Sequence, residues 1–165
     1  MGIRRIGRHL IANRWRVRRA FPRLALVNIE KAIKASEASH EGQIRFVVEG
    51  ALDGRPLFVN QSPRARAVDV FSRLRVWDTA HRNGVLIYLL LADRDVEIVA
   101  DRGIDAKVGK AAWEQICKAM EIEFGARNFE RGALKGIAEV TALLTTHYPS
   151  SGPHRNELPD KPLVI

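Results

Sequence analysis

Acidic side chains between Asp78 and Asp105 are the residues of this sequence best suited to chemistry. Hard cations such as calcium and magnesium need several oxygen ligands, usually including carboxylates, at about 2.0–2.6 Å. Asp78 and Asn83 precede an apolar run, and Asp101 and Asp105 follow the alternating segment after it. If the two segments pair as antiparallel strands, the start of the first lies beside the end of the second. The sequence therefore predicts a candidate metal site at one sheet edge, formed by Asp78, Asn83, Asp101 and Asp105. The alternative is that Asp78 and Asp105 are only helix caps and surface charges.

Two basic residues beside this edge are candidates for a catalytic role. Arg102 could bind a phosphate group or pair with Asp101, and His81 could act as a general base. A histidine at a helix end can instead be a surface group that complements the helix dipole. The sequence contains no G-x-S-x-G, P-loop or G-x-G-x-x-G motif, which argues against a metal-free hydrolase or a nucleotide-binding domain.

Hydrophobic periodicity predicts strands at 43–49, 85–91 and 96–100. The middle segment is apolar on both faces, as expected for a central strand that is covered on two sides. Helices are expected after Pro22, from Ser62-Pro63 to about Arg82, at about 106–124 and at about 132–147. The order α-β-α-β-β-α-α predicts an α/β fold with a small mixed sheet and helices on both faces.

The positive charge of the chain is concentrated at its N-terminus. The net charge is +8, and residues 1–23 hold eight arginines and no acidic residue, so the remainder is neutral. Apolar residues alternate with these arginines, which predicts a basic N-terminal arm that contacts an anionic membrane surface. The alternative is a tail that is solvated or packed on the domain. No nucleic-acid binding is expected, because base-stacking aromatic residues do not accompany the arginines.

The length of 165 residues suits one domain, expected at 24–149, followed by a disordered tail at 150–165 that holds three prolines. The single Cys117 excludes a disulfide framework and is expected to be a buried, inert thiol. No apolar run is long enough for a transmembrane helix, and the N-terminus lacks the apolar core of a signal peptide. We therefore expect a cytoplasmic protein that is peripheral at the inner membrane.

Several short motifs, in this order and spacing, resemble the TPM domain family over about 24–148. They are Ile44–Val48 after Gly42, Asn83–Ile87 after an amphipathic helix, the return strand Arg94–Val99 with Asp101–Gly103, and Phe129-Glu130 followed by Ala133–Ile137. The family includes a thylakoid-lumen protein of photosystem II repair and bacterial proteins tethered to membranes.

The resemblance implies an αβα sandwich, a calcium or magnesium site at one end of the sheet, and an acid-phosphatase activity. It also implies a protein partner of the LemA membrane-protein type. The sequence departs from the family pattern at Gln43, where members carry glutamate, and at Asp101–Gly103, where they carry Gly-Tyr-Gly.

Two functions follow as hypotheses. The first is a binding or regulatory TPM domain that acts at the cytoplasmic membrane face with a protein partner. The second is a divalent-metal-dependent phosphatase that acts on phosphomonoesters. In the second, Asp78, Asp101 and Asp105 would share the cation and Arg102 would bind the phosphate.

Overall fold

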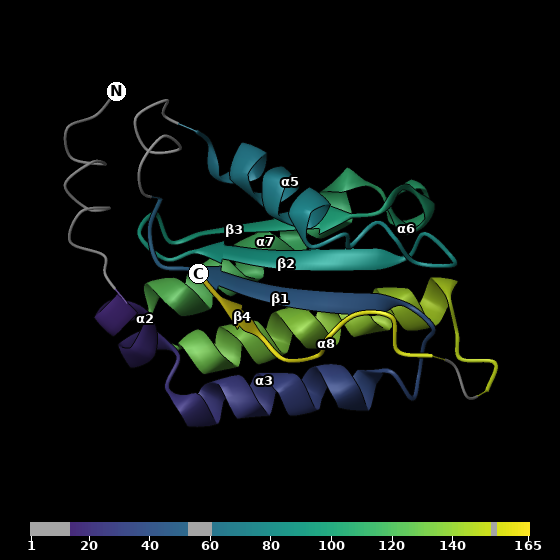
Figure 1. Cartoon of the computed structure of the whole chain (residues 1–165), viewed down its shortest axis with the longest axis horizontal. Helices are drawn as coiled ribbons and strands as arrows, with labels where there is room; N and C mark the ends of the chain where they lie inside the picture. The colour runs from purple at the N-terminus through teal and green to yellow at the C-terminus, as the bar shows by residue number, and fades with distance from the viewer. Residues whose placement is uncertain (1–13, 53–60, 153–154) are drawn as a thin grey trace.

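A computed structural model describes residues 14–52, 61–152 and 155–165 of the chain. Its sheet has the strand order β3-β2-β1-β4 (Figure 1). These strands are β1 (Gln43–Glu49), β2 (Gly84–Leu90), β3 (Asp95–Ala100) and β4 (Leu163–Val164). β1 lies parallel to β2 and to β4, whereas β2 and β3 form an antiparallel pair. The predicted mixed sheet is confirmed.

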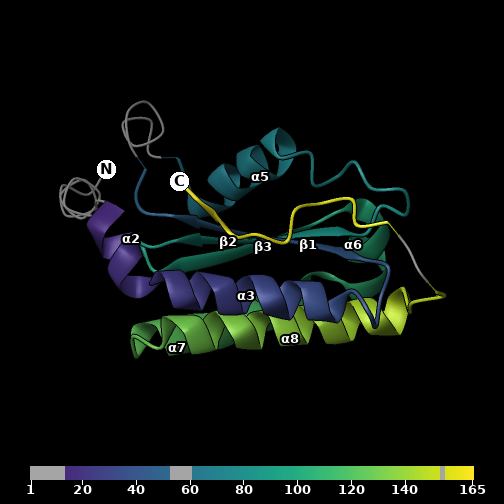
Figure 2. The same ribbon diagram turned by 60° about the horizontal axis from the view of Figure 1, so that its bottom comes forward.

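Helices cover both faces of the sheet, which confirms the αβα sandwich (Figure 2). One face packs against α3 (Arg23–Ser36), α7 (Lys110–Gly125) and α8 (Phe129–His147). The other face packs against α5 (Pro63–Arg73). Every residue of β2 is buried, because its side chains alternate between these two cores.

The helix that begins at Ser62-Pro63 is shorter than expected. The Ser62 side chain accepts a hydrogen bond from the Ala65 N–H and caps α5, as its sequence predicts. The helix ends at Arg73 and not near Arg82, and Arg75 has a positive φ of 53°. The chain then turns so that Val76 is buried in the core. Burial of Val76 in that turn therefore replaces the continued helix.

The helix expected at about 106–124 is two helices. α6 (Arg102–Val108) and α7 are separated by Gly109, whose φ of 81° favours glycine. Asp101 caps α6, because its side chain accepts a hydrogen bond from the Arg102 N–H at 2.7 Å. The break separates Asp101 and Arg102 from the long helix α7.

The described part of the N-terminal arm is packed on the domain. Residues Arg14–Ala20 form α2, and Val17 and Phe21 are buried in the core under α3 and α7. The Phe21 ring lies 6.2 Å from that of Phe46 and 5.7 Å from that of Phe129. For residues 14–23 the structure therefore shows the alternative, an arm that is packed on the domain. The remainder of the expected arm, 1–13, lies outside the described residues.

The prediction of a disordered tail is corrected for residues 155–165. The Gln43 side-chain oxygen accepts hydrogen bonds from the N–H groups of Glu157 and Leu158, both at 3.0 Å. Arg45 donates to the carbonyl oxygens of Pro159 and Lys161. β4 then extends the sheet beside β1. Polar side chains of β1 thus bind backbone that a proline-rich composition would leave solvated.

No helix in the described parts of the chain is long and apolar enough to cross a membrane.

Candidate functional site

Asn83 and Asp101 lie together at the sheet edge where β1 and β2 begin and β3 ends. The Gln43 N–H donates to the Asn83 carbonyl oxygen at 3.3 Å, and the Asp101 N–H donates to the Gly84 carbonyl oxygen at 2.8 Å. Asn83 is fully buried and Asp101 is 8% exposed. Backbone hydrogen bonds between three strands therefore fix both residues at this edge.

Each of these two side chains has one buried oxygen that has no hydrogen-bond partner among the described residues. Asn83 uses its Nδ2 group to donate to the Glu41 carbonyl oxygen at 3.1 Å, and Asp101 uses Oδ1 to cap α6. Among the described residues, Asn83 Oδ1 and Asp101 Oδ2 are buried and accept no hydrogen bond. Buried oxygens without a partner cost about 1–3 kcal/mol each, so a water molecule or a ligand is needed to satisfy them. A divalent cation fits, because carboxylate and amide oxygens are the ligands that calcium and magnesium bind.

Asp78 and Asp105, the other two predicted ligands, are directed elsewhere. Asp78 is exposed and pairs with Arg75 at 2.6 Å. Asp105 Oδ1 accepts a hydrogen bond from the Trp113 indole N–H at 3.0 Å. No group of three or more histidine, cysteine, aspartate or glutamate side chains suited to a metal ion occurs within 14–52, 61–152 and 155–165. The structure thus brings together two of the four predicted ligands.

The two catalytic candidates flank the same edge and are exposed. His81 Nε2 lies 3.7 Å from Glu41 Oε2. Arg102 is the first residue of α6, directly after Asp101. This end of the sheet therefore carries a histidine beside a carboxylate, and an arginine that directly follows Asp101 in the chain.

Glu41 is a residue of this edge that sequence reasoning missed. Its carbonyl oxygen orients Asn83, and its carboxylate contacts His81 and the Ser151 side chain. The position of Glu41 two residues before β1 was the available signal. Parallel strands begin at the same edge, so a residue before β1 lies near a residue before β2.

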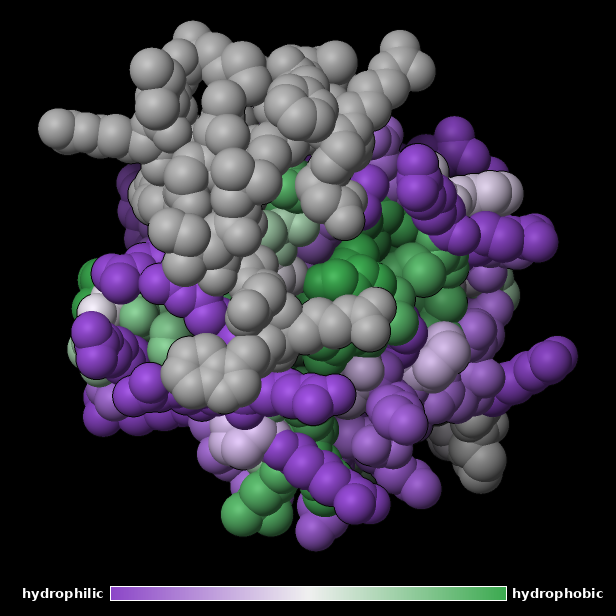
Figure 3. Space-filling view, turned by 60° about the vertical axis from the view of Figure 1, so that its left-hand side comes forward, coloured by the Kyte–Doolittle hydropathy of each residue, from purple (hydrophilic) through white to green (hydrophobic). Residues whose placement is uncertain are grey.

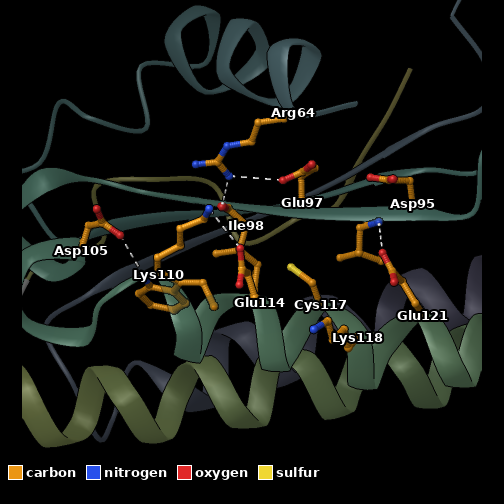
Figure 4. Close-up of a pocket in the computed structure, with 12 residues that line it drawn as sticks. Arg64, Asp95, Glu97, Ile98, Asp105, Lys110, Glu114, Cys117, Lys118 and Glu121 are labelled. Atoms are coloured by element: carbon orange, nitrogen blue, oxygen red, sulfur yellow. Dashed lines mark hydrogen bonds and ion pairs between the residues drawn. The ribbon is translucent and has the colours of Figure 1, made fainter. Parts of the chain in front are cut away.

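A separate groove of about 600 Å³ runs between β3 and α7, with Arg64 of α5 on its other side (Figure 4). Burial raises the pKa of the Cys117 thiol in this groove to about 12, so the thiol stays protonated at neutral pH. Cys117 is partly buried and not fully buried as expected, and the direction of the shift agrees with an inert thiol. Burial also raises the pKa of Glu97. The neighbouring carboxylates of Glu121 and Glu114 raise it further, whereas Arg64 lowers it.

A basic end forms where α2 meets the turn between α7 and α8. We define the basic end by five exposed arginines: Arg16, Arg18, Arg19, Arg127 and Arg131. Arg19, Arg127 and Arg131 line one open cavity of about 910 Å³. Figure 3 looks at this side of the molecule and shows hydrophilic side chains around a hydrophobic area.

The carboxylates near the basic end are already engaged. Glu123 pairs with Arg131 at 2.9 Å, and Glu130 accepts a hydrogen bond from the Asn28 side chain at 2.7 Å. The five arginines outnumber these two carboxylates, so the field at this end is positive.

Comparison with known proteins supplies a family. The family model described as the TPM domain matches residues 23–143. The NMR structure of the BA42 protein from the psychrophilic bacterium Bizionia argentinensis is similar, with a TM-score of 0.73 and 28% identity over 86% of this chain and 92% of that one. The N-terminal domain of a protein from P. gingivalis has the same fold, with a TM-score of 0.57 and 18% identity over 76% of both chains. No curated protein sequence matches the chain.

Proposed function

Since the chain belongs to the TPM domain family, whose match spans residues 23–143, we propose that it is a regulatory binding domain that holds a calcium or magnesium ion through Asn83 and Asp101. The observation that carries this proposal is the pair of buried oxygens, Asn83 Oδ1 and Asp101 Oδ2, that accept no hydrogen bond from any described residue. Together they offer one negative charge and two hard oxygen ligands.

The residues around this pair orient it for a cation. Asn83 donates a hydrogen bond from Nδ2 to the Glu41 carbonyl oxygen, which leaves Asn83 Oδ1 to bind the cation. The Arg102 N–H donates a hydrogen bond to Asp101 Oδ1, which leaves Asp101 Oδ2 to bind the cation. A bound cation would compensate the Asp101 charge at the end of the sheet where β2 begins and β3 ends. With one carboxylate the site fits weak, about millimolar, binding, in the range of low-charge calcium sites.

Calorimetric titration with calcium chloride and magnesium chloride tests the proposal. We expect saturable binding of one cation by the full chain and its loss in Asp101→Asn. Asparagine still caps α6 but lacks the charge and the second carboxylate oxygen. At a cation concentration of about 100 Kd, binding should stabilise the fold by about 2.7 kcal/mol. That is about 5–10 °C in melting temperature for a domain of this size.

Asp78→Asn is the matched control, because the Asp78 carboxylate pairs with Arg75 at the surface. It should bind the cation as the native protein does. Equal binding by the native protein and Asp101→Asn would refute the proposal, as would a flat titration of the native protein.

A metal-dependent phosphatase is the second candidate. It is favoured by one observation, the position of His81 and Arg102 beside the buried pair. Arg102 could bind a phosphate oxygen, and His81, beside Glu41, could transfer a proton. Cation-dependent turnover of p-nitrophenyl phosphate, retained through repurification and abolished in Asp101→Asn, would favour this candidate over a regulatory role.

The basic end supports a second proposal, that this domain associates with an anionic membrane surface. The family resemblance adds the proposal that a LemA-type membrane protein is its partner at that surface. Each arginine near such a surface contributes up to about 1 kcal/mol. Arg16, Arg18 and Arg19 are exposed on α2, whereas Val17 between them is buried. Deletion of α2 would therefore expose the core, and charge removal is the cleaner change.

Replacing Arg16, Arg18 and Arg19 by glutamine should weaken binding to phosphatidylglycerol vesicles about a hundredfold, because about 3 kcal/mol is lost. Vesicle sedimentation at low salt measures this. The matched control replaces three exposed cations outside the basic end, Lys34, Arg73 and Lys161. If both triple variants bind alike, only net charge matters and the basic end is not a docking surface.

A further inference from the structure

β3 is an edge strand of the described sheet, and its outer side lies in the groove between α5 and α7. In an antiparallel pair, alternate residues bond to the neighbouring strand. The Asp101 N–H bonds to Gly84 of β2, so the peptide groups of Val96 and Ile98 face away from β2. Unlike the groups that bond to β2, these are placed to pair with a further strand.

Side chains, not another strand, occupy these outward peptide groups (Figure 4). Glu121 of α7 accepts a hydrogen bond from the Val96 N–H at 3.2 Å. Arg64 of α5 donates to the Ile98 carbonyl oxygen, although its side chain is 55% exposed. Both are long side chains that can turn to solvent. A peptide backbone can therefore displace these two side chains and form hydrogen bonds with the outer side of β3.

The charges of the groove select the kind of peptide. Five carboxylates and three cationic side chains line it, in a protein whose net charge is +8. Two of the cations are paired, Arg64 with Glu97 and Lys110 with Glu114, each at 3.3 Å. The lining as a whole therefore has two more acidic than basic side chains, and the groove is acidic.

We propose that this groove binds an extended peptide segment rich in lysine or arginine, which adds to the sheet as a strand beside β3. Backbone hydrogen bonds to Val96 and Ile98 give affinity, and the groove carboxylates select basic side chains. A volume of about 600 Å³ lies within the usual range of ligand pockets. This inference rests on the proposed function, because it gives the regulatory domain a partner segment.

A second copy of this chain is the less suitable occupant. Pairing of β3 with β3 of another copy would bring two acidic grooves together, and like charges across an interface cost free energy. A basic peptide meets the same backbone groups with complementary charge.

Fluorescence anisotropy with the full chain and three labelled ten-residue peptides tests the proposal. The first alternates lysine and threonine, the second alternates glutamate and threonine, and the third is the first with alternate backbone nitrogens methylated. We expect the first to bind at least tenfold more tightly than either of the others. Methylation removes strand pairing without changing charge, so equal binding of the methylated peptide would overturn strand addition.

Protein variants locate the binding. Glu114→Gln with Glu121→Gln should weaken binding of the lysine peptide at least tenfold, because two groove charges are lost. Glu30→Gln with Glu139→Gln removes the same charge outside the groove and should leave binding unchanged. Failure of all three peptides to bind, or a β3-mediated dimer of the free protein, would overturn the proposal.

The peptide proposal and the cation proposal can be rejected independently of each other. Peptide binding that persists in Asp101→Asn, which has lost the cation, leaves this inference standing without the cation site. Cation binding by a protein that binds no peptide rejects only this inference.

Discussion

Gly84→Ala is expected to lower the free energy of unfolding by about 3 kcal/mol or more, and to unfold much of the protein at 37 °C. An alanine Cβ at this position would lie 2.0 Å from the Val76 carbonyl oxygen. That oxygen belongs to the backbone of a buried turn and cannot move aside as a flexible side chain can. Overpacking in a core costs about 1–3 kcal/mol and more where backbone must shift. Urea unfolding followed by circular dichroism measures the loss.

Gly125→Ala is the matched control, because nothing lies within 4 Å of a Cβ added at the end of α7. This change should leave stability equal or slightly higher, since alanine reduces the entropy of the unfolded chain. A Gly84→Ala protein as stable as Gly125→Ala would contradict the close approach. The close approach of Gly84 to the Val76 carbonyl oxygen matters for the proposed function. Gly84 directly follows Asn83, and this contact holds the start of β2 in place.

Glu49→Ala is expected to destabilise the fold by about 3–5 kcal/mol. Glu49 is buried, accepts two hydrogen bonds from Arg66, both at 2.8 Å, and accepts one from the Tyr88 hydroxyl at 2.6 Å. Its removal leaves a guanidinium charge and a buried hydroxyl without their acceptor. Hydrogen bonding to Glu49 raises the pKa of Arg66, and burial raises the pKa of Tyr88 well above its usual value. Both directions keep Arg66 charged and Tyr88 neutral.

Two milder variants calibrate this prediction, again by urea unfolding. Tyr88→Phe removes one hydrogen bond and keeps the ion pair, so it should cost about 1 kcal/mol. Arg64→Ala breaks a half-exposed pair with Glu97, for which a loss of about 1 kcal/mol or less is expected. If Glu49→Ala costs no more than these, the buried cluster contributes little to the sheet.

The layers of this fold could be predicted from the sequence because its patterns are local. The run from Val85 is apolar on both faces, which requires two covering layers, and Ser62-Pro63 marks a helix start by its own chemistry. The errors come from long-range contacts. Composition predicts a disordered tail, whereas Gln43 and Arg45, more than a hundred residues earlier, bind its backbone. Burial of Val17 and Phe21 likewise depends on a distant aromatic cluster.

The candidate site could be predicted in part for the same reason. The direction of the hairpin brings Asn83 and Asp101 together, and strand order alone determines that. The spacing also predicts Asp78 and Asp105 beside them, but these side chains bond to Arg75 and Trp113 respectively. Spacing along the chain places a backbone position and does not show which partner a side chain binds. Glu41 was missed because its role depends on the parallel pairing of β1 with β2.

An NMR titration of the full chain with calcium or magnesium tests the cation proposal most directly, because it reports each amide separately. We predict shifts of the Asn83 side-chain amide and of the backbone amides of Gly84, Asp101 and Arg102. The amides of Arg75 and Asp78 should stay in place, and Asp101→Asn should show none of these shifts. Shifts confined to residues away from Asn83 and Asp101, or the same shifts in Asp101→Asn, would contradict a cation held by this buried pair.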